Sequence, residues 1–512
     1  MAVNTIETVA ILGGGTAGWM TASALAKSFP GKLKIILVES EEIGIVGVGE
    51  ATVPSINVFN AAMGFDVPHF MRACDATFKL GIEFVDWGAV GRRYMHPFTN
   101  FGTDVTRKDF ASLWMQFAKY QQEKGIFCAI DDYNLACLAA SQGKFILPEK
   151  GKPVPVGPMR YAFHFDAALY ARFLRSHAEK LGVTRVEGKA ISVCQDVETG
   201  FIKSIVLDGG AVVTADFFVD CSGFQGVLIE KTLKTGYDNW KHWLPCDRAV
   251  AVPSQNVTPL APFTHSTADR AGWRWRIPLQ NRTGNGHVYA SDFMSDDEAE
   301  RRLIEGLEGP ALAVARRLSF VTGKRRKIWS HNCVAIGLSS GFLEPLESTS
   351  IYMIQTGIVR LMRLFSDMGY DRKKVTEYNR LCTEEFETIR DFLILHYKLS
   401  VRDDSEFWRH CRHMSVPDAV TANLEQFART GQVAIPPNHP FPVQGWLSVM
   451  LGQGGLPQGL EALPSGIDIA SLDAYMQHTR NLLQQTVAPM PAQQDFLSFI
   501  LQVRPGQQTP AA

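Results

Sequence analysis

The segment "TVAILGGGTAGWMTASALAKSFP", residues 8–30, limits the possible folds more than any other stretch of the chain. It predicts a short buried parallel strand over residues 9–12, then a glycine turn, then a helix. The turn has the spacing G-x-G-x-x-G, formed by Gly13, Gly15 and Gly18. In this pattern the first glycine allows a tight turn, the second lets a pyrophosphate approach the backbone, and the third lets the helix pack against the strand. The helix N-terminus at residues 16–18 adds free N–H groups and a positive dipole end.

A lone glycine motif is weak evidence, but the residues that follow agree with a nucleotide site. A second predicted strand, "KLKIILVES", contains Glu39 near its end, 21 residues after Gly18, where a carboxylate is placed to bind a ribose hydroxyl. The next loop, "EEIGIVGVGEATVPSI", has closely spaced glycines, Gly49 among them, that let backbone lie flat against a planar ligand. A nicotinamide-dependent dehydrogenase would continue with another strand and helix there. We therefore expect a flavin, and the alternative is a glycine turn without a ligand.

The middle of the chain predicts a strand and helix followed by a group of strands. Residues 159–183 have this strand–helix pattern, with Asp166 as the expected N-cap. Three β-forming runs at 190–196, 201–207 and 211–223 are separated by turn signals, which favours a meander. His164 is a possible ligand, although a histidine near a strand end is more often structural. Beyond residue 360 the apolar residues recur with helical period, except in the glycine- and proline-rich stretch 436–464, which predicts irregular structure.

Composition and charge exclude several classes of function. The 512 residues have a formal net charge of −1 and no basic block, so the sequence gives no electrostatic case for binding nucleic acid or an anionic membrane. No stretch approaches the roughly 20 apolar residues that a transmembrane helix needs. The N-terminus does not resemble a signal peptide. Nine cysteines without metal-type spacing predict reduced thiols, no metal site and a cytoplasmic location.

Three motifs together suggest a family. "GGGTAGW" lies at 13–19, "WRWRIP" at 273–278 has the pattern W-x-W-x-I-P, and a lysine and a glutamate complete the set: Lys79 in "TFKLGIEF" and Glu347 in "EPLEST". On these motifs the chain resembles the flavin-dependent halogenases of the tryptophan halogenase family, along nearly its whole length. W-x-W-x-I-P is the most specific of them, because it separates these halogenases from flavin monooxygenases.

The resemblance implies a reaction in two stages. Reduced FAD, supplied by a separate reductase through diffusive transfer, reacts with O2 to give a C4a-hydroperoxide, which a halide co-substrate attacks to yield hypohalous acid. That acid passes through a tunnel to Lys79, which directs electrophilic substitution of a small aromatic substrate, while Glu347 activates the electrophile or accepts the ring proton. The residue types agree with these roles. Apolar neighbours of Lys79 would disfavour its ammonium form, and Glu347 is a possible proton acceptor. The structural alternatives are that Lys79 faces solvent and that Glu347 is an ordinary acid in the first turn of a helix.

The resemblance also assigns the remaining site residues. It places halide at Thr349 and Ser350, and substrate or tunnel at His96, Phe98, Trp273, Trp275 and Ser348. It places FAD at Gly13, Gly15, Thr16, Ala17, Gly18, Glu39, Gly49, Ala51, Ala190, Leu338 and Ile351. Helix capping by Ser348 or Thr349 is a further expectation for the turn "FLEPLESTSIYM".

Two departures from the family pattern concern halide and substrate. Tryptophan-specific members typically have glycine where this chain has Ser350, and we expect the bulkier serine to favour bromide. They also grip the amino acid with a tyrosine pair and a glutamate, whereas "NHPFPVQGWLSVMLGQGG" has neither. We therefore expect an indole or another electron-rich arene as substrate rather than free tryptophan, with Phe441 and Trp446 as walls.

The expected fold is α/β: a Rossmann-like FAD-binding fold of the two-dinucleotide type, with an inserted substrate-side β-sheet and a C-terminal helical region. We expect a discontinuous FAD-binding module at 1–75, 150–230 and 325–360, because "FFVDCSGFQG" and "VAIGLSSGF" resemble flavin-contacting segments of such proteins. A substrate and tunnel region at 76–149 and 231–324, a helical region at 361–490 and a disordered tail at 503–512 complete the prediction. A homodimer is expected by analogy. The competing hypotheses are a flavin-dependent aromatic monooxygenase and an FAD-binding scaffold without turnover.

Overall fold

The computed structural model describes residues 5–43, 49–102, 110–148, 159–365, 370–436, 439–463 and 465–503. The chain forms two compact units, each made of three separate segments. The first unit contains Met1–Ala76, Phe165–His242 and Ser319–Glu387, and the second contains Thr77–His164, Trp243–Leu318 and Thr388–Ala512. None of the helices in the described ranges has the length and apolar content needed to cross a bilayer. The tail predicted to be disordered lies outside the described residues, apart from Val503.

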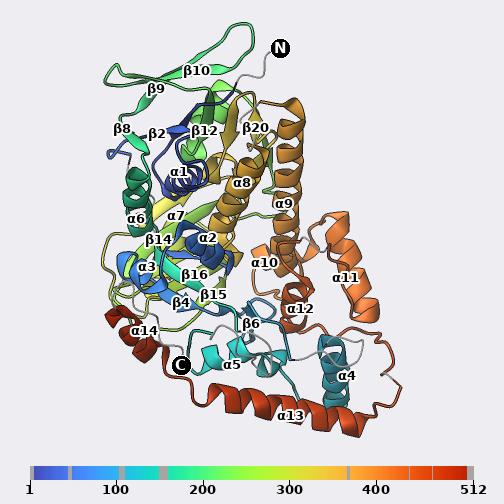
Figure 1. Ribbon diagram of the computed structural model, residues 1–512. Coiled ribbons are helices and arrows are strands. Elements are labelled where there is room, and N and C mark those ends of the chain that lie inside the picture. Colours follow the sequence, from blue (N-terminus) through green and yellow to red (C-terminus); the bar gives the residue numbers. More distant parts are fainter. Residues whose placement is uncertain are drawn as a thin grey trace. The chain divides into compact units, whose positions relative to one another are not determined.

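The first unit is built on a six-stranded sheet in the order β20-β21-β12-β1-β2-β8 (Figure 1). Its strands are β1 (Thr8–Leu12), β2 (Lys34–Glu39), β8 (Thr184–Glu187), β12 (Phe217–Asp220), β20 (Trp329–Ser330) and β21 (Cys333–Ala335). β1 pairs in parallel with both β2 and β12, so the first predicted strand lies inside the sheet. Helix α1 (Thr16–Ser28) follows the glycine turn and packs against α6 (Ala167–Lys180). The predicted Rossmann-like arrangement is confirmed.

The predicted meander is confirmed with one correction. Strands β9 (Ala190–Gln195), β10 (Ile202–Leu207) and β11 (Val212–Thr214) form an antiparallel sheet of three strands. The run 211–223, which the sequence predicted as one strand, divides after Thr214, and its second half becomes β12 of the main sheet. The division follows from pairing, because β12 bonds in parallel to β1 whereas β11 bonds to β10. Asp166 is the N-cap of α6, as predicted, and its carboxylate accepts from the N–H groups of Ala168 and Leu169.

Shorter elements complete the first unit. A small sheet joins β13 (Tyr237–Asn239), β19 (Gly323–Arg325) and β22 (Gly341–Phe342). The segment "VAIGLSSGF" (334–342) is not a single strand: β21 ends at Ala335, and the 3₁₀ turn η4 (Gly337–Ser339) precedes β22. The other elements are β3 (Gly49–Ala51), α2 (Ser55–Met63), α3 (Val67–Ala73), η2 (Gly223–Gln225), the π-helix η3 (Val227–Thr232), η5 (Pro345–Glu347), α8 (Ser350–Leu364) and most of α9 (Arg372–Lys398).

The second unit contains a seven-stranded sheet in the order β18-β14-β17-β16-β15-β5-β6. Its strands are β5 (Gly81–Val85), β6 (Arg93–Pro97), β14 (Arg248–Ser254), β15 (Thr264–Asp269), β16 (Gly272–Pro278), β17 (Thr283–Tyr289) and β18 (Arg316–Ser319). β16 contains W-x-W-x-I-P and lies centrally, paired with β15 and β17. Strand β4 (Thr77–Lys79) pairs antiparallel with β7 (Ala162–Asp166), and the chain leads directly from β4 into β5.

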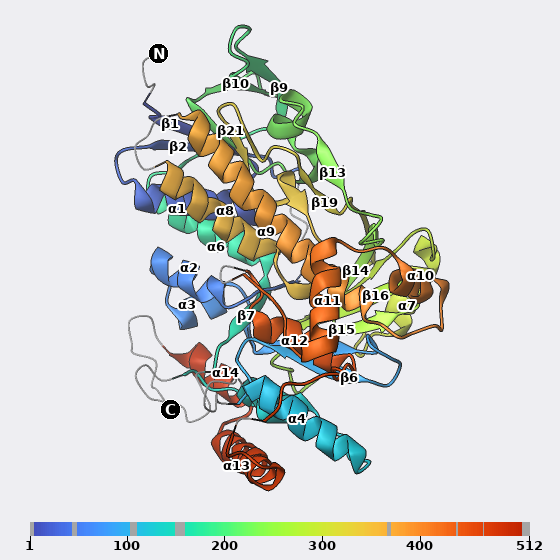
Figure 2. The same cartoon turned by 90° about the vertical axis from the view of Figure 1, so that its right-hand side faces the viewer.

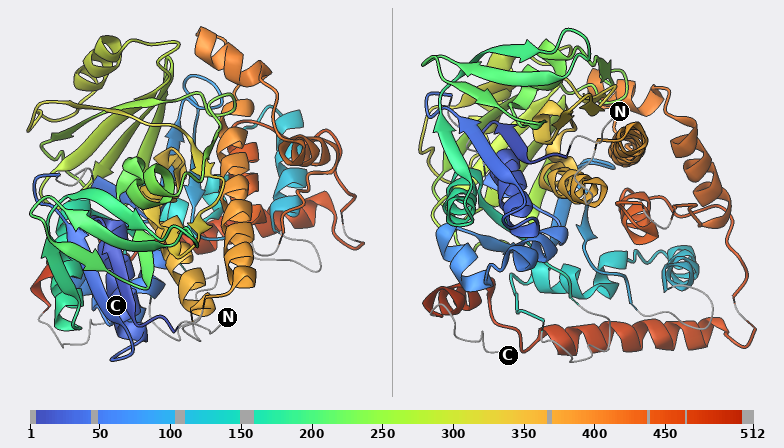
Figure 3. Two further views of the ribbon diagram at one scale, coloured as in Figure 1. Left: turned by 90° about the horizontal axis from the view of Figure 1, so that it is seen from above. Right: turned by 45° about the horizontal axis from the view of Figure 1, so that its top comes forward.

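Helices make up the rest of the second unit (Figure 2). They are α4 (Phe110–Glu123), η1 (Ile130–Tyr133), α5 (Leu135–Ser141), α7 (Asp296–Glu305), α10 (Glu406–His413), α11 (Asp418–Thr430), α12 (Val443–Gly452), α13 (Ile469–Val487) and α14 (Gln493–Gln502). α13 is the long red helix in the right view of Figure 3 and packs against α4 and α5. The helical C-terminal prediction is confirmed, but the irregular structure expected over 436–464 is wrong for its centre. There, seven consecutive residues of α12, Gly445–Leu451, are buried, and this burial stabilises a helix despite its glycines.

Candidate active site

The glycine turn in the first unit has the geometry of a phosphate cradle. Gly13 has φ +115°, and a Cβ added there would lie 2.2 Å from the Cys221 carbonyl oxygen. A Cβ at Gly18 would lie 1.9 Å from the Gly13 carbonyl oxygen, so α1 packs on the turn as predicted. Gly15 differs from both, because a Cβ there would meet nothing within 4 Å. Gly13 and Gly18 are thus in close contact with backbone atoms, whereas the space beside Gly15 is open. This space leaves room for a pyrophosphate beside the helix N-terminus.

Glu39 lies against this turn and is held by cationic neighbours that the sequence did not suggest. A Cβ at Gly14 would collide with its carboxylate at 1.5 Å from Oε2. Oε1 accepts from Arg185 Nε at 2.5 Å and lies 3.4 Å from Arg175 Nη1, while Trp19 Nε1 donates to Oε2 at 3.3 Å. Arg185 comes from β8, which pairs beside β2. No local signal links these positions, since only the parallel pairing of distant strands brings them together.

Two further predicted FAD residues, Ala17 of α1 and Leu338 of η4, lie near helix α8. Gly337 has φ +79°, and a Cβ there would lie 2.7 Å from Ala17 Cβ and 3.7 Å from an Ile354 methylene carbon of α8. Leu338 follows Gly337 in η4, and Ile351 is buried in the first turn of α8. The structure therefore brings Ala17, Leu338 and α8 into one region. Ala51 is buried in β3, and Ala190 begins β9. The glycine turn, Ala17, Leu338 and the start of α8 thus have an arrangement that fits FAD, whereas the roles of Ala51 and Ala190 stay predictions.

The segment "EPLESTS" (344–350) contains η5 and leads into α8, and most of its residues are buried. Glu347 is 2 % exposed, and Ser348 has φ +59°, a left-handed conformation that a residue other than glycine rarely adopts. Thr349 occupies the N-cap position of α8, but its side chain makes no capping hydrogen bond. Its hydroxyl is buried without a hydrogen-bond partner in the described part of the chain. Capping by Thr349 is therefore wrong, so this side chain does not compete with an anion for the N-terminal groups of α8.

Lys79 is fully buried in the second unit. It ends β4, opposite Ala162 of β7, and its side chain has 0 % exposure. Its ammonium lies 5.3 Å from the ring centroid of Phe98, which is partly exposed. The predicted solvent-facing alternative is therefore excluded. The structure brings Lys79 and Phe98 together, as the resemblance implied.

Aromatic side chains surround the neighbouring part of β6. His96 is 7 % exposed and lies 5.6 Å from Phe392 and 6.1 Å from Phe441, between ring centroids. Phe392 and Phe441 stack at 3.9 Å, and Trp446 of α12 lies 5.6 Å from Phe392. Phe392 was missed from the sequence, because it sits unmarked in the long helix α9. The Trp446 indole N–H is buried and has no hydrogen-bond partner in the described residues. We call His96, Phe98, Phe392, Phe441 and Trp446 the aromatic wall.

The two tryptophans of W-x-W-x-I-P lie on one face of β16. Trp273 is 1 % exposed and lies 6.4 Å from Trp87, between ring centroids. Trp275 lies 6.1 Å from Trp273 and packs so closely on Gly286 that a Cβ there would meet its ring at 2.0 Å. Both belong to the aromatic packing of the second unit, and their tunnel role stays a prediction.

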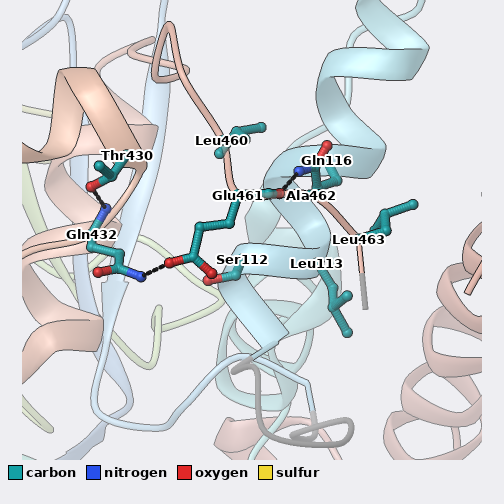
Figure 4. A pocket seen from close by; sticks show the side chains of 9 residues that line it. All are labelled: Ser112, Leu113, Gln116, Thr430, Gln432, Leu460, Glu461, Ala462 and Leu463. Carbon is teal, nitrogen blue, oxygen red and sulfur yellow. Dashed lines mark hydrogen bonds between the residues drawn. The ribbon is translucent and has the colours of Figure 1, made fainter. Parts of the chain in front are cut away.

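A surface pocket of the second unit lies apart from these residues (Figure 4). It is lined by Ser112, Leu113, Gln116, Thr430, Gln432, Leu460, Glu461, Ala462 and Leu463. Inside it, Gln432 donates to the Glu461 carboxylate at 2.8 Å. Its empty volume of about 290 Å³ includes open solvent, and it contains none of the predicted site residues, so it is no candidate for the active site.

Comparisons with known proteins agree with the geometry. A family model described as tryptophan halogenase matches residues 8–467. The tryptophan 6-halogenase SttH from Streptomyces toxytricini is 34% identical over 519 residues, which cover 96% of this chain and 98% of that protein. A flavin-dependent halogenase from Xanthomonas campestris has a solved structure with a TM-score of 0.92 and 43% identity, over 97% of this chain and 99% of that one. The flavin-dependent halogenase BrvH from Brevundimonas sp. BAL3 has a TM-score of 0.92 and 42% identity over the same shares.

Proposed function

The chain belongs to the tryptophan halogenase family, and on that premise we propose that it halogenates a small electron-rich arene, such as an indole, rather than free tryptophan. As a flavin-dependent halogenase it uses reduced FAD from a separate reductase, O2 and a halide. The bound cofactor supplies the two electrons that, with O2, convert halide to hypohalous acid. Overall, reduced FAD, O2, halide, one proton and the arene give FAD, the haloarene and two waters, so both oxygen atoms leave as water.

Lys79 is the residue that directs the electrophile in this proposal. Its amine would hold hypohalous acid beside the substrate, by a hydrogen bond or as a haloamine. Complete burial keeps this nitrogen out of bulk water, which suits a group that reacts with hypohalous acid rather than with solvent. Phe98, 5.3 Å from the ammonium position, offers a flat ring against which an arene can stack.

Glu347 and the start of α8 supply the polar groups of the first unit. We assign Glu347 to activating the electrophile or accepting the proton that leaves the ring; its burial supports a role other than that of a solvated helix acid. We assign halide binding to Thr349 and Ser350. The N-terminus of α8, which Thr349 does not cap, supports this assignment, since helix N–H groups and the helix dipole attract anions.

The aromatic wall is the observation that most supports an uncharged aromatic substrate. Four of its five residues, His96, Phe392, Phe441 and Trp446, are connected by ring contacts, and none of the five is acidic. No acidic residue occurs between Asn438 and Leu460. The ammonium and carboxylate of free tryptophan would therefore have no ionic partners from this segment, whereas an indole ring needs only apolar area.

Trp273 and Trp275 would guide hypohalous acid towards the substrate. Trp273 is buried and Trp275 is partly exposed, and their mutual packing makes an aromatic surface. Such a surface would also keep the arene away from the cofactor and so prevent hydroxylation.

Product analysis tests this function directly. The protein is incubated with FAD, a flavin reductase, NADH and bromide or chloride, and offered indole, substituted indoles, phenols and tryptophan. Mass spectrometry should show halogenated indoles or phenols in excess of halotryptophan. Hydroxylated products without halogen would support a monooxygenase instead. Lys79→Ala should form no haloarene while reduced FAD is still oxidised, and a normal product yield from this variant would refute the role of Lys79.

Halide preference has its own test. We propose that Ser350 favours bromide, because its side chain adds bulk where tryptophan-specific relatives of the family have glycine. With equal concentrations of bromide and chloride, bromination should be faster than chlorination. Ser350→Gly should make the ratio of the two rates smaller. Faster chlorination by the unaltered protein would contradict the assignment.

A further inference from the structure

A chain of four buried polar groups runs beside Lys79. The Thr77 hydroxyl donates to the Pro278 carbonyl oxygen at 2.6 Å. The same hydroxyl lies 3.2 Å from His164 Nδ1, and His164 Nε2 lies 2.9 Å from the Thr264 hydroxyl. Thr77 and His164 have 0 % exposure and Thr264 has 5 %. We call Thr264, His164, Thr77 and Pro278 the polar chain.

The direction of these hydrogen bonds can be derived by counting protons. A hydroxyl has one proton, and Thr77 uses its proton on Pro278, so it can only accept from His164. His164 must therefore have its proton on Nδ1, and Nε2 must accept from the Thr264 hydroxyl. The reverse direction would leave the Thr77 and Pro278 oxygens 2.6 Å apart with no proton between them. Burial holds the pKa of His164 well below its usual range, and the Lys79 charge lowers this pKa further. The imidazole is thus neutral and fully bonded.

The polar chain is attached to the strand that contains Lys79. Thr77 and His164 are opposite one another in the β4–β7 pair, and Lys79 and Ala162 form the next pair on the same face. Pro278 is the last residue of W-x-W-x-I-P, and Thr264 begins the adjacent strand β15. The polar chain therefore ties β4 to β15 and β16 two residues before Lys79. One residue after it, Leu80 donates its N–H to the Pro262 carbonyl at 2.7 Å and accepts from the Phe98 N–H at 3.2 Å.

We infer that Thr264, His164 and Thr77 are positioning residues, which fix Lys79 against the W-x-W-x-I-P strand so that its amine captures the electrophile. This inference rests on the proposed role of Lys79. It gives His164 a task that its neutral, fully bonded imidazole can perform, whereas such a ring has no lone pair left to act as a base. It also gives W-x-W-x-I-P a second purpose, since its terminal carbonyl anchors the lysine strand. A displacement of about 1 Å can lower a rate 100-fold when two groups must meet, so a small shift of β4 would matter.

Isosteric substitutions separate positioning from simple stability. Thr77→Val keeps the shape and removes the hydroxyl, whereas Thr77→Ser keeps the hydroxyl. Thr322→Val is the matched control, because Thr322 is 1 % exposed and its hydroxyl has no hydrogen-bond partner among the described residues. Each variant is assayed for reduced FAD oxidation, haloarene formation, and hypohalous acid trapped by an added scavenger.

The expected result is a loss of coupling, by which we mean the haloarene formed per reduced FAD oxidised, without a change in the oxidation of reduced FAD. Thr77→Val should form haloarene at least about tenfold more slowly, with reduced FAD oxidised at the normal rate and more hypohalous acid trapped. Thr77→Ser and Thr322→Val should both couple normally. Normal coupling in Thr77→Val, or an equal loss in Thr77→Ser, would overturn the inference. Lys79→Ala in the same assay separates the two proposals: if it too makes haloarene normally, the role of Lys79 fails, and if only Thr77→Val does, the positioning role fails.

The tautomer gives a second test that needs no activity and applies even if Thr77→Val does not fold. Nitrogen-15 NMR of histidine-labelled protein should show His164 as a neutral ring protonated on Nδ1 at pH 7, assigned by the signal that His164→Asn or His164→Gln removes. A ring protonated on Nε2, or a histidinium, would contradict the bonding pattern on which the inference depends.

Discussion

Thr349 illustrates how a single residue can have the right type for one task and the geometry for another. Threonine at the start of a helix predicts capping, yet its hydroxyl in this protein is buried without a partner. An unbonded buried hydroxyl is destabilising, so its presence at the start of α8 supports the proposed halide site.

Thr349→Val should therefore separate stability from function. We expect the free energy of unfolding to stay equal or rise by about 1 kcal/mol, because an unsatisfied polar group is removed. We expect the KM for bromide to rise several-fold, because the halide loses a hydroxyl donor. Thermal unfolding and halide titrations of the bromination rate measure the two effects. An unchanged KM would mean that the hydroxyl faces away from the halide.

Asp131 provides the residue-scale prediction for pH. Its carboxylate accepts from the Met95 N–H at 2.9 Å, next to His96, and burial raises its pKa to about 7. The folded protein therefore retains a proton that the unfolded chain loses near pH 4, and stability falls as the pH rises from about 4 to about 7. Asp131→Asn keeps an acceptor for Met95 and removes the ionisation.

The variant should thus be more stable than the unaltered protein by about 1 kcal/mol or more above pH 7, and should gain little at pH 4. Denaturant unfolding at several pH values measures the difference. A gain that is the same at every pH would show that the ionisation of Asp131 is not responsible.

At the scale of elements, the glycine turn shows that residues of one type have different tasks. Gly18 allows α1 to approach β1, whereas Gly15 borders open space. Both facts follow from the strand–turn–helix geometry, and the sequence motif predicted both. In contrast, the partners of Glu39 and the helical centre of 436–464 depend on neighbours that are remote in sequence.

Gly18→Ala should therefore affect mainly stability, whereas Gly15→Ala should affect mainly FAD binding. The methyl of Gly18→Ala collides with the Gly13 carbonyl, and we expect a loss of about 1–3 kcal/mol in stability. Gly15→Ala should change stability by less than about 0.5 kcal/mol, but weaken FAD binding about tenfold, because its methyl occupies the space for the pyrophosphate. Thermal unfolding without FAD and FAD titrations test the pair. Normal FAD affinity in Gly15→Ala would move the cofactor away from this turn.

At the scale of the whole molecule, each unit is assembled from segments that are distant in the chain. Strand β4 shows the consequence within the second unit. On the face opposite Lys79, Phe78 stacks on Phe145 at 3.9 Å and lies 5.8 Å from Phe496 of α14, between ring centroids. Gln493, at the start of α14, donates to the carbonyl oxygens of Gly143 and Leu260. The C-terminal helix thus supports the strand of the proposed catalytic lysine.

Phe496→Ala should destabilise the protein by about 3 kcal/mol, because it leaves a cavity beneath Phe78. Phe499→Ala on the same helix is the control, since Phe499 is 42% exposed, and it should cost less than about 1 kcal/mol. Haloarene yield per reduced FAD should fall in Phe496→Ala and remain normal in Phe499→Ala. Equal effects of the two variants would show that α14 does not support β4 specifically.

The sequence by itself determined the local chemistry of this protein. It predicted the phosphate turn from its glycines, the family from W-x-W-x-I-P with Lys79 and Glu347, and the weak case for free tryptophan from the residues absent near Trp446. These features are visible because their residues are close in the chain or of a distinctive type. Only the tertiary structure decided that Arg175 and Arg185 hold Glu39, that Phe392 joins the aromatic wall, and that His164 connects Thr77 to Thr264. The contacts of Glu39 and of His164, and that of Phe392 with His96, each span more than 80 residues. Strand pairing and side-chain packing, which leave no local pattern in the sequence, bring these partners together.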